Sequence, residues 1–466
     1  MTEVPSSTSS NSCAWPARPT DAFSGIVGDI VSAIDPHSEA DPIAIAIQVL
    51  VAFGNVIGRD PHVRVEADRH TGALFAVLVG ETSRARKGTS GGYLRPLFAF
   101  DENFDSRLEQ GLSSGEGLVH RIRDRRVIVK TGGEEEVLDE GIADKRVVVL
   151  ESEFASVLRM TERSGNTLSP VIRSAWDGST LGTLTKSNAQ KATGPHVSII
   201  GHVTLEELRH LLGAIEVANG FGNRFIWAAV RRSKLLPDGG NLRDGDLAAL
   251  SRRLGSAVHH ASRVGEMRRD EDARRLWFEM YPELTTSVPG VVGALTARAE
   301  AQVVRLSLLY ALLDESDVID ERHLIAALDL WNYCRDSVIY AFGDKTGNTD
   351  ADAILRNLRT SDEGLTRTEI SAVFGRNLSA ARLDSALTLL HENGLATVET
   401  VATGGRPAER WSARTKETNF TKEVVAQPTP LSLVSETRED DSIAGRARAR
   451  EERDLLAELE PDGVTP

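Results

Sequence analysis

Residues 74–90 read Leu-Phe-Ala-Val-Leu-Val-Gly-Glu-Thr-Ser-Arg-Ala-Arg-Lys-Gly-Thr-Ser, and this stretch decides the predicted fold. An apolar run ends at Gly80, a polar loop follows, and Lys87 opens a run of small and hydroxyl-bearing residues. The pattern predicts a buried strand, a loop and the start of a helix. Such a loop binds phosphate through backbone N–H groups, a lysine charge, a hydroxyl that holds Mg²⁺ and the N-terminus of the helix.

The spacing departs from the usual phosphate-loop pattern. Lys87 lies seven residues after Gly80 instead of six, and Gly88 follows the lysine instead of preceding it. Arg84 and Arg86 add two positive charges that can contact phosphate. The loop alone leaves two interpretations open, a phosphate site or an ordinary basic turn. The candidate nucleotide-binding residues are Gly80, Arg86, Lys87, Gly88, Thr89 and Ser90.

Length and composition are those of an ordinary globular chain. It has 466 residues, 41% hydrophobic and 26% charged, which allows two or three domains. A net charge of −14 confines any contact with nucleic acid to local sites. Cys13 and Cys334 have neither metal nor disulfide spacing, so we expect a reduced, cytoplasmic compartment. Residues 1–20 show no signal peptide, and the longest apolar stretch, 42–57, is too short and interrupted to span a membrane.

Further buried strands are predicted within residues 146–154, 196–204 and 219–227. The first ends in acids, and Thr204, at the end of the second, opens a helix as a capping-box residue. Strands and helices alternate with crossover-length connections. The predicted fold class is therefore α/β, a mainly parallel sheet covered by helices on both faces.

The regions around these strands are assigned by the same patterns. Helices are predicted over 22–34 and 41–56, the second capped by Asp41 before a proline. The acidic stretch 132–140 is predicted to be a solvated loop. A polar loop that carries Lys186 and Lys191 precedes the strand at 196.

The second half of the chain is predicted to add a helical bundle and a smaller module. Residues 241–345 have helical periodicity, and His323 is expected to have a structural role at a helix start. Within 350–413, two helices joined by a turn and followed by a hairpin predict a winged helix. DNA contact and protein contact both stay open for this module. Its candidate phosphate contacts are Arg376, Arg382 and Arg406.

The two ends of the chain, residues 1–20 and 414–466, are rich in Ser, Thr, Pro and charged residues, which predicts disorder.

Residues 22–342 resemble the RecA-like P-loop ATPases of the phage and plasmid primase-associated replicative helicase type. The resemblance rests on the order of five segments. They are 79–90, 112–118 (Leu-Ser-Ser-Gly-Glu-Gly-Leu), 147–154 (Val-Val-Val-Leu-Glu-Ser-Glu-Phe), 196–204 (His-Val-Ser-Ile-Ile-Gly-His-Val-Thr) and 223–225 (Asn-Arg-Phe). It implies an ATPase core over 21–240, with ATP and Mg²⁺ as cofactors.

The resemblance also implies roles at the nucleotide. Lys87 would contact the β- and γ-phosphates, while Thr89 or Ser90 would ligand Mg²⁺. Glu151 or Glu153 would hold the metal or its water. The alternative for these two acids is a solvated strand end.

Further catalytic roles follow from the same resemblance. Glu116 would activate the attacking water as a general base. His202 and Thr204 would sense the γ-phosphate. Arg224 would be an arginine finger offered to a neighbouring subunit. The structural alternatives are a helix cap for Glu116 and an ion pair within the fold for Arg224.

The resemblance implies an ATP-hydrolysing DNA-replication motor, a helicase-like ATPase of a mobile element that translocates on single-stranded DNA. It would form a homo-oligomeric ring, with Lys186 and Lys191 facing the central channel, and would work with a separate primase. The alternative for the lysines is a solvated loop. The alternative for the protein is a DNA-binding replication initiator or regulator with a degenerate, non-hydrolysing nucleotide site.

Overall fold

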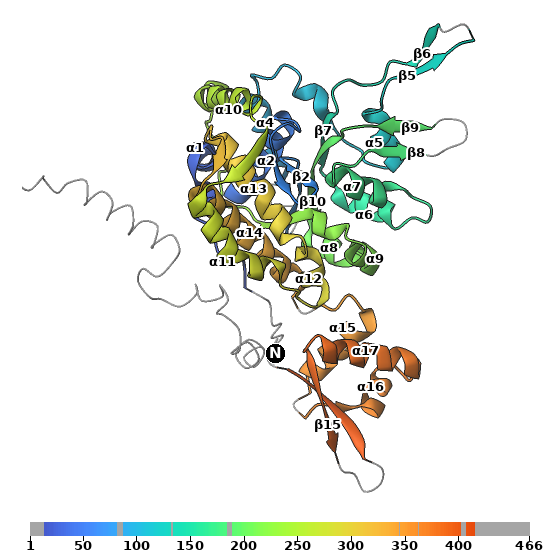
Figure 1. Ribbon diagram of the computed structural model, residues 1–466. Coiled ribbons are helices and arrows are strands. Elements are labelled where there is room, and N and C mark those ends of the chain that lie inside the picture. Colours follow the sequence, from blue (N-terminus) through green and yellow to red (C-terminus); the bar gives the residue numbers. More distant parts are fainter. Residues whose placement is uncertain are drawn as a thin grey trace, which may run out of the picture. The chain divides into compact units, whose positions relative to one another are not determined.

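The computed structural model describes residues 14–81, 87–131, 134–183, 189–343, 345–361, 363–401 and 407–414 (Figure 1). The predicted disorder of 1–13 and 415–466 falls outside these residues. None of the described helices is long and apolar enough to cross a membrane.

A five-stranded parallel sheet forms the centre of the fold, which confirms the predicted α/β class. Its strands lie in the order β11-β3-β10-β7-β4, and each neighbouring pair is parallel. The inner strands consist of the apolar runs found in the sequence, as expected for strands covered on both faces. The bounds are β3 Phe75–Gly80, β4 Leu108–Glu109, β7 Arg146–Glu151, β10 His196–Thr204 and β11 Phe225–Val230.

One face of the sheet is covered by α2 (Pro42–Val56), which begins at the predicted N-cap, where the Asp41 side chain accepts a hydrogen bond from Ile43 N–H. All of α2 is buried, as expected for a helix that is apolar all round. At its end Asn55 Nδ2 donates to the carbonyls of Val147 and His196, at 3.0 and 3.2 Å. These bonds tie α2 to β7 and β10.

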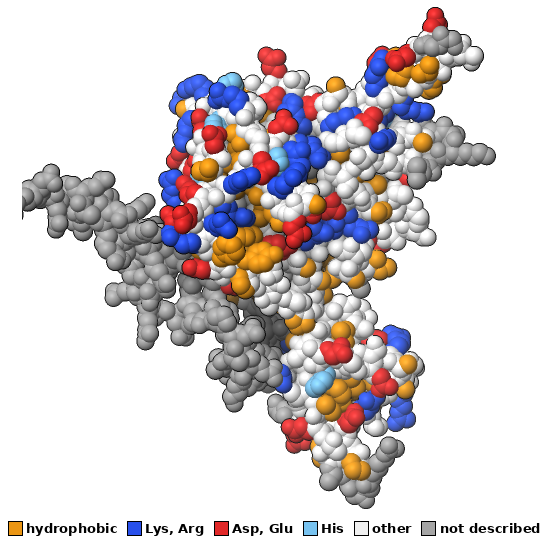
Figure 2. Space-filling view, in the orientation of Figure 1, with side chains coloured by type: hydrophobic (Ala, Val, Ile, Leu, Met, Phe, Trp, Pro, Cys, Tyr) orange, Lys and Arg blue, Asp and Glu red, His pale blue; other side chains and the backbone are white. Residues whose placement is uncertain are grey.

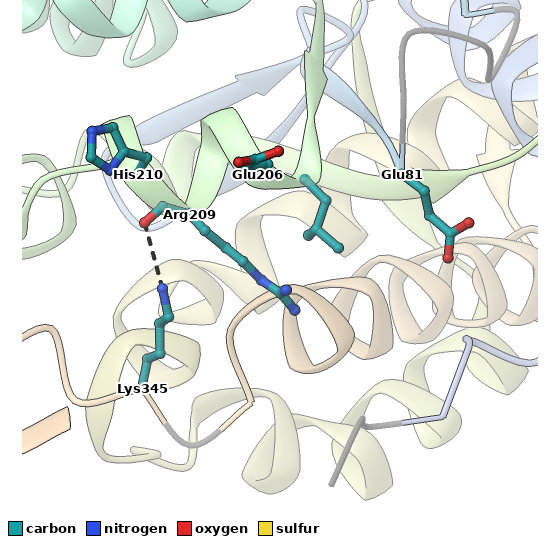
Figure 3. A pocket seen from close by; sticks show the side chains of 6 residues that line it. Glu81, Glu206, Arg209, His210 and Lys345 are labelled. Carbon is teal, nitrogen blue, oxygen red and sulfur yellow. Dashed lines mark hydrogen bonds between the residues drawn. The ribbon is translucent and has the colours of Figure 1, made fainter. Parts of the chain in front are cut away.

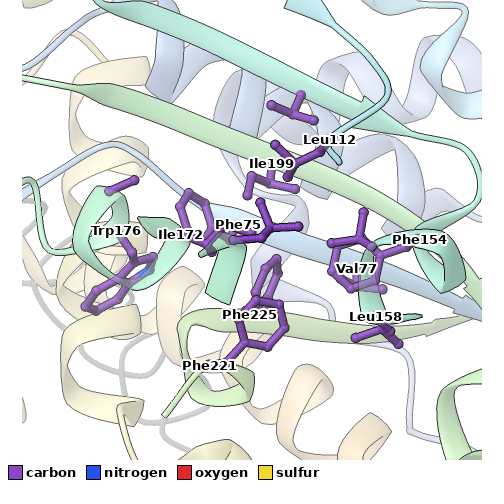
Figure 4. Packing of buried hydrophobic residues seen from close by; sticks show 14 of the residues in the cluster. Phe75, Val77, Leu112, Phe154, Leu158, Ile172, Trp176, Ile199, Phe221 and Phe225 are labelled. Carbon is purple, nitrogen blue, oxygen red and sulfur yellow. The ribbon is translucent and has the colours of Figure 1, made fainter. Parts of the chain in front are cut away.

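The opposite face holds an aromatic core (Figure 4). The ring of Phe225 lies 5.3 Å from the ring of Phe75 and 5.3 Å from that of Phe154, measured between centroids. Shorter helices cover this face and contribute to the same cluster. They are α5 Gly115–Arg121, α6 Phe154–Thr161, α7 Leu168–Trp176, α8 Leu205–Leu211, α9 Ala214–Ala218 and α12 Gly290–Thr296.

A buried histidine at the start of β10 makes the fold sensitive to acid. Burial lowers the pKa of His196 from its ordinary 6.5 to about 4, and one ring nitrogen lies 2.8 Å from the Gly54 carbonyl. The unfolded chain then binds more protons between pH 6.5 and 4, so the stability present above pH 6.5 is lost as the pH falls.

We expect the free energy of unfolding to drop by on the order of 2–3 kcal/mol from this residue between pH 7 and 4.5. His196→Gln replaces the imidazole N–H donor by an amide donor that does not titrate. The stability of this variant should therefore depend less on pH. Urea unfolding at both pH values measures this. If the free energy of unfolding changed equally with pH in the variant and the natural protein, His196 would not be the source of the pH dependence.

Residues 241–345, predicted to be wholly helical, contain two strands as well. β12 (Glu266–Arg269) and β13 (Val318–Ile319) join β1 (His62–Val65) and β2 (Asp68–Thr71) in a second sheet, in the order β13-β12-β1-β2. The two added strands are too short to disturb the helical periodicity of the sequence. The helices are α10 Ala248–Ala261, α11 Glu271–Thr285, α13 Ala299–Leu313 and α14 Glu321–Phe342, with α1 Gly25–Ile34 packed against α2 and α10. His323 is buried and closes the capping box of α14, as predicted.

Two segments predicted as loops are β-hairpins. β5 (Arg126–Val129) pairs with β6 (Glu135–Asp139), and β6 lies inside the stretch 132–140 predicted as a solvated loop. The Arg123 side chain donates to Asp139 Oδ2 at 2.6 Å, so this acid has a fixed partner. β8 (Leu181–Thr183) pairs with β9 (Gln190–Ala192) in the loop that carries Lys191.

The N-terminal segment packs on the fold from residue 14 onward, although 1–20 was predicted to be disordered. The Trp15 ring lies 5.0 Å from the Tyr340 ring of α14, and the Arg231 guanidinium lies 4.7 Å above Trp15. The prediction failed because it rested on the polar composition of the segment. A single large aromatic side chain, Trp15, is enough to hold the segment on the fold.

The C-terminal module has the predicted sequence of elements and an apolar core of its own. A capping box formed by Thr366 and Glu369 begins α16. A three-stranded antiparallel sheet of order β14-β16-β15 accompanies three helices. The elements are α15 Thr349–Arg359, β14 Leu365–Thr366, α16 Arg367–Val373, α17 Ala380–Glu392, β15 Ala396–Val401 and β16 Ala408–Ala413.

Candidate functional site

The carboxyl ends of β3, β10 and β7 place the main sequence motifs at one edge of the sheet. Thr204 pairs with Gly80, the last residue of β3. On the other side of β10, Gly201 pairs with Glu151, the last residue of β7. Because β10 separates the two strands, their ends stand two strand spacings apart across the sheet, roughly 10 Å. Glu151 also pairs three residues earlier on β10 than Gly80 does, which adds an offset of roughly 10 Å along the strands.

The chain leaves β3 and β10 in opposite directions. α3 (Lys87–Gly91) and α4 (Leu94–Leu97) follow β3 and contact α2 on one side of the sheet. α8 follows β10 and joins the aromatic core on the other. Such a reversal is a topological switch point, where open α/β sheets bind their ligands.

A pocket of about 380 Å³ opens beside this point (Figure 3). Glu81, the residue after β3, lines it together with Leu205, Glu206, Arg209 and His210 of α8 and with Lys345. Arg209 donates to the Ala341 and Tyr340 carbonyls at the end of α14. Burial lowers the pKa of Lys345, and Glu81 accepts a 2.7 Å hydrogen bond from Tyr340 Oη. The sequence patterns missed Arg209 and Lys345 as pocket residues. Arg209 comes from α8 and Lys345 from the segment after α14, and the two share no motif.

The phosphate-loop candidate is described in part. The predicted strand and helix are both present, with β3 ending at Gly80 and α3 beginning at Lys87. Residues 82–86, including Arg86, and the side chains of Lys87 and Thr89 lie outside the described residues. Gly88 is exposed and a Cβ there would meet no neighbour, so its position is open to solvent.

Ser90 differs from the expected metal ligand. It is 1% exposed, and its hydroxyl accepts a hydrogen bond from Gln48 Nε2 of α2. A ligand of a nucleotide-bound metal must be reached from solvent, so of the two hydroxyls only Thr89 is retained as a candidate.

The acids of the second motif differ in surroundings. Glu151 is 6% exposed, and its Oε1 accepts a 2.6 Å hydrogen bond from Leu112 N–H. This bond brings the segment that carries Glu116 to the end of β7. Glu116 is exposed in the first turn of α5, whose N-cap is Ser114 and not Glu116. Glu153 is exposed and makes no capping hydrogen bond at the start of α6.

The sensor candidates lie at the end of β10. The Thr204 hydroxyl and Glu207 form the capping box of α8, with Glu207 N–H donating to Thr204 Oγ1 at 3.2 Å. Thr204 therefore already has a structural role. His202 is half-buried beside Leu78 of β3.

Arg224 lies at the opposite edge of the sheet, directly before β11. It is 7% exposed, and its guanidinium donates to Asp177 Oδ2 at 2.8 Å and to the Gly220 carbonyl at 2.6 Å. An arginine finger needs a guanidinium that can reach another subunit's nucleotide. The observed contacts are those of the structural alternative, an ion pair within the fold.

Three of the five DNA-contact candidates are described. Lys191 is exposed on β9, and Arg376 is exposed with a φ of 61° at the turn between α16 and α17. Arg382 makes two hydrogen bonds to Asp350, of 2.9 and 2.8 Å, which neutralises its charge locally. Lys186 and Arg406 lie outside the described residues.

Among the residues that the structure describes, no three His, Cys, Asp or Glu side chains form a cluster suited to a metal ion. A magnesium ion that arrives with a nucleotide does not need such a cluster, because phosphates and water supply most of its ligands. Comparison with protein-family models and with curated proteins finds no match for this chain.

Proposed function

We propose that this chain is an ATP-hydrolysing motor that acts on single-stranded DNA, of the RecA-like type. One observation carries the proposal: the strand, loop and helix at β3 and the acid-tipped β7 flank the end of β10 at the switch point of a parallel sheet. The two strand ends are offset both across and along the sheet, which leaves room for a phosphate group with its metal and a water molecule. The solvent-open Gly88 supports a backbone that approaches phosphate closely.

In this proposal each residue at the edge has a defined task. Lys87 and the first N–H groups of α3 bind and orient the phosphates, and Thr89 supplies the hydroxyl for the metal. Bound ATP and Mg²⁺ supply the phosphoryl group and the charge that neutralises it. An exposed acid, either Glu116 in the first turn of α5 or Glu153 two residues after β7, accepts the proton of the attacking water.

Glu151 has a positioning task in this scheme. Its buried carboxylate holds the Leu112 backbone and so fixes the segment that carries Glu116. The Glu81–Tyr340 hydrogen bond links the loop after β3 to α14, through which nucleotide binding can act on other elements.

The wider assembly is part of the same proposal. The chain would form a homo-oligomeric ring, cooperate with a separate primase and use its C-terminal module as a winged helix. The three helices and three-stranded sheet of residues 349–413 support that last assignment.

Steady-state ATP hydrolysis by the purified chain, with and without single-stranded DNA, tests the proposal. We expect magnesium-dependent turnover that rises when DNA is added. Absence of turnover under both conditions would refute the motor and leave the alternative function.

The alternative is a DNA-binding replication initiator or regulator with a non-hydrolysing nucleotide site. Two contacts favour it: Ser90 is engaged by Gln48, and Glu151 is engaged by Leu112 N–H. The Ser90 hydroxyl and the Glu151 carboxylate would then stabilise the carboxyl ends of the strands and would not bind a metal ion. Such a protein should bind DNA without turning over ATP.

A further inference from the structure

The exposed side of α11 carries aromatic side chains that a solvated helix does not need. Phe278 is 63% exposed and Tyr281 is 44% exposed. They lie three residues apart, on neighbouring positions of one helix face. Figure 2 shows hydrophobic side chains gathered over the region where Figure 1 draws α11, with charged side chains of both signs beside them. Exposed apolar surface with a polar border is typical of a binding site.

Two arginines stack against aromatic rings of this helix. The Arg269 guanidinium lies 3.9 Å from the ring centre of Trp277, and that of Arg274 lies 5.5 Å from the ring centre of Phe278. Nε and Nη2 of Arg269 are buried and have no hydrogen-bond partner among the described residues. Burial lowers the pKa of Arg269 to about 10, so the group is still charged at neutral pH. A buried charge with open donors is costly unless an anion binds it.

A pocket of about 400 Å³ lies at the start of α11 and is lined by Arg269, Arg274, Arg275, Phe278, Asp270 and Glu271. Two of its charged groups already have partners. Asp270 accepts a 2.8 Å hydrogen bond from Ala273 N–H, and Arg275 pairs with Asp272. The lining holds three arginines against two acids, and Arg269 and Arg274 make no ion pair among the described residues. The pocket therefore carries an excess of positive charge, which favours an anion.

We propose that this arginine–aromatic surface, formed by Arg269, Arg274, Trp277, Phe278 and Tyr281, binds single-stranded nucleic acid. The two arginines contact phosphates, and bases stack on Phe278 and Tyr281. The inference rests on the proposed function for its choice of ligand. It places the nucleic-acid strand on α11, which contains none of the lysines and arginines that the sequence motifs suggested.

The chemistry selects a single strand over a duplex. In a duplex the bases stack on one another and offer no face to an aromatic side chain, whereas unpaired bases do. Phe278 and Tyr281 are separated by about 4.5 Å along the helix axis, which lets a short run of nucleotides cover both rings. The overall charge of −14 makes such a local basic surface necessary for DNA binding.

The test is fluorescence anisotropy of a labelled oligothymidylate with the full chain. We expect Phe278→Ala and Tyr281→Ala each to weaken binding by roughly fivefold to 100-fold. Arg274→Ala should reduce the slope of log affinity against log salt by about 0.7, the value for one phosphate of a single strand. Leu235→Ala and Arg243→Ala are the matched controls, because both side chains are highly exposed elsewhere, and they should not change affinity.

A second measurement does not depend on variants. Photocrosslinking of an oligonucleotide that contains 5-iododeoxyuridine should label the α11 peptide of the natural chain. Unchanged affinity in both aromatic variants, or crosslinks only elsewhere, would overturn the inference. So would variants that keep their DNA affinity but lose an oligomeric state seen by light scattering, since the surface would then be a protein contact.

ATP turnover without DNA, measured in parallel, separates this inference from the proposed function. The control variant Arg243→Ala should hydrolyse ATP at the natural basal rate. If the natural chain shows no turnover but its oligonucleotide affinity depends on Phe278, the motor fails and the binding surface stands.

Discussion

Lys87→Ala should lower the rate of ATP hydrolysis by on the order of 10²–10³-fold, the usual cost of removing one preorganised charge donor from a reaction centre. Lys87 is the first residue of α3, the helix that follows β3 in the chain. A lysine there supplies positive charge to the phosphates that no neighbouring backbone group can replace. Steady-state turnover of the variant and the natural chain, at saturating ATP, measures the effect.

The matched control is Lys191→Ala, which removes an exposed lysine from the β8–β9 hairpin. It should retain basal turnover. Affinity for single-stranded DNA should survive in Lys87→Ala, because the arginine–aromatic surface is separate from the phosphate loop. If Lys87→Ala hydrolysed ATP at the natural rate, Lys87 would not be the phosphate-binding lysine of the loop. Arg86 would then be the candidate for that contact.

The sequence predicted the central sheet well for a physical reason. Strands buried on both faces must be almost continuously apolar, so the segments ending at Gly80, Glu151 and Thr204 are plain in the sequence. The helix α2 was equally clear, because Asp41 and the following proline mark its start. The hairpin β15–β16 was predicted too, but the edge strand β4 and the short strands β5, β6, β8, β9, β12 and β13 were not. Short hairpins such as β5–β6 satisfy their backbone with few apolar residues and resemble loops.

The candidate site was predictable where a motif lies at the end of a strand. Its remaining parts were not, because they depend on contacts between distant segments. Nothing near Ser90 in sequence indicates that Gln48 covers its hydroxyl, and nothing near Arg224 indicates the ion pair with Asp177. The stacked Arg269 and Trp277 belong to a strand end and a helix that meet only in the fold. Sequence patterns predict where strands end. Which side chains at those ends are free to bind a ligand depends on packing between distant segments.

Phe225→Ala is expected to lower the free energy of unfolding of the α/β core by about 3–5 kcal/mol. Phe225 is 1% exposed, and its ring lies 5.0 Å from that of Phe221 and 5.7 Å from that of Trp227, in addition to its contacts with Phe75 and Phe154. Removing it leaves a cavity that close-packed rings on β3, β11 and α6 cannot fill by small movements.

The same substitution should also disturb the candidate site through Phe154, which follows Glu153 in the chain. Phe154 packs closely on Gly201, where an added Cβ would come within 2.5 Å of its ring. Thermal and urea unfolding followed by tryptophan fluorescence measure the loss, with Phe278→Ala as the matched control. That substitution removes the same side chain from a position 63% exposed, so it should cost less than about 0.5 kcal/mol. A small effect of Phe225→Ala, or similar effects of both variants, would contradict the packing of the sheet described here, since burial is the property that separates the two phenylalanines.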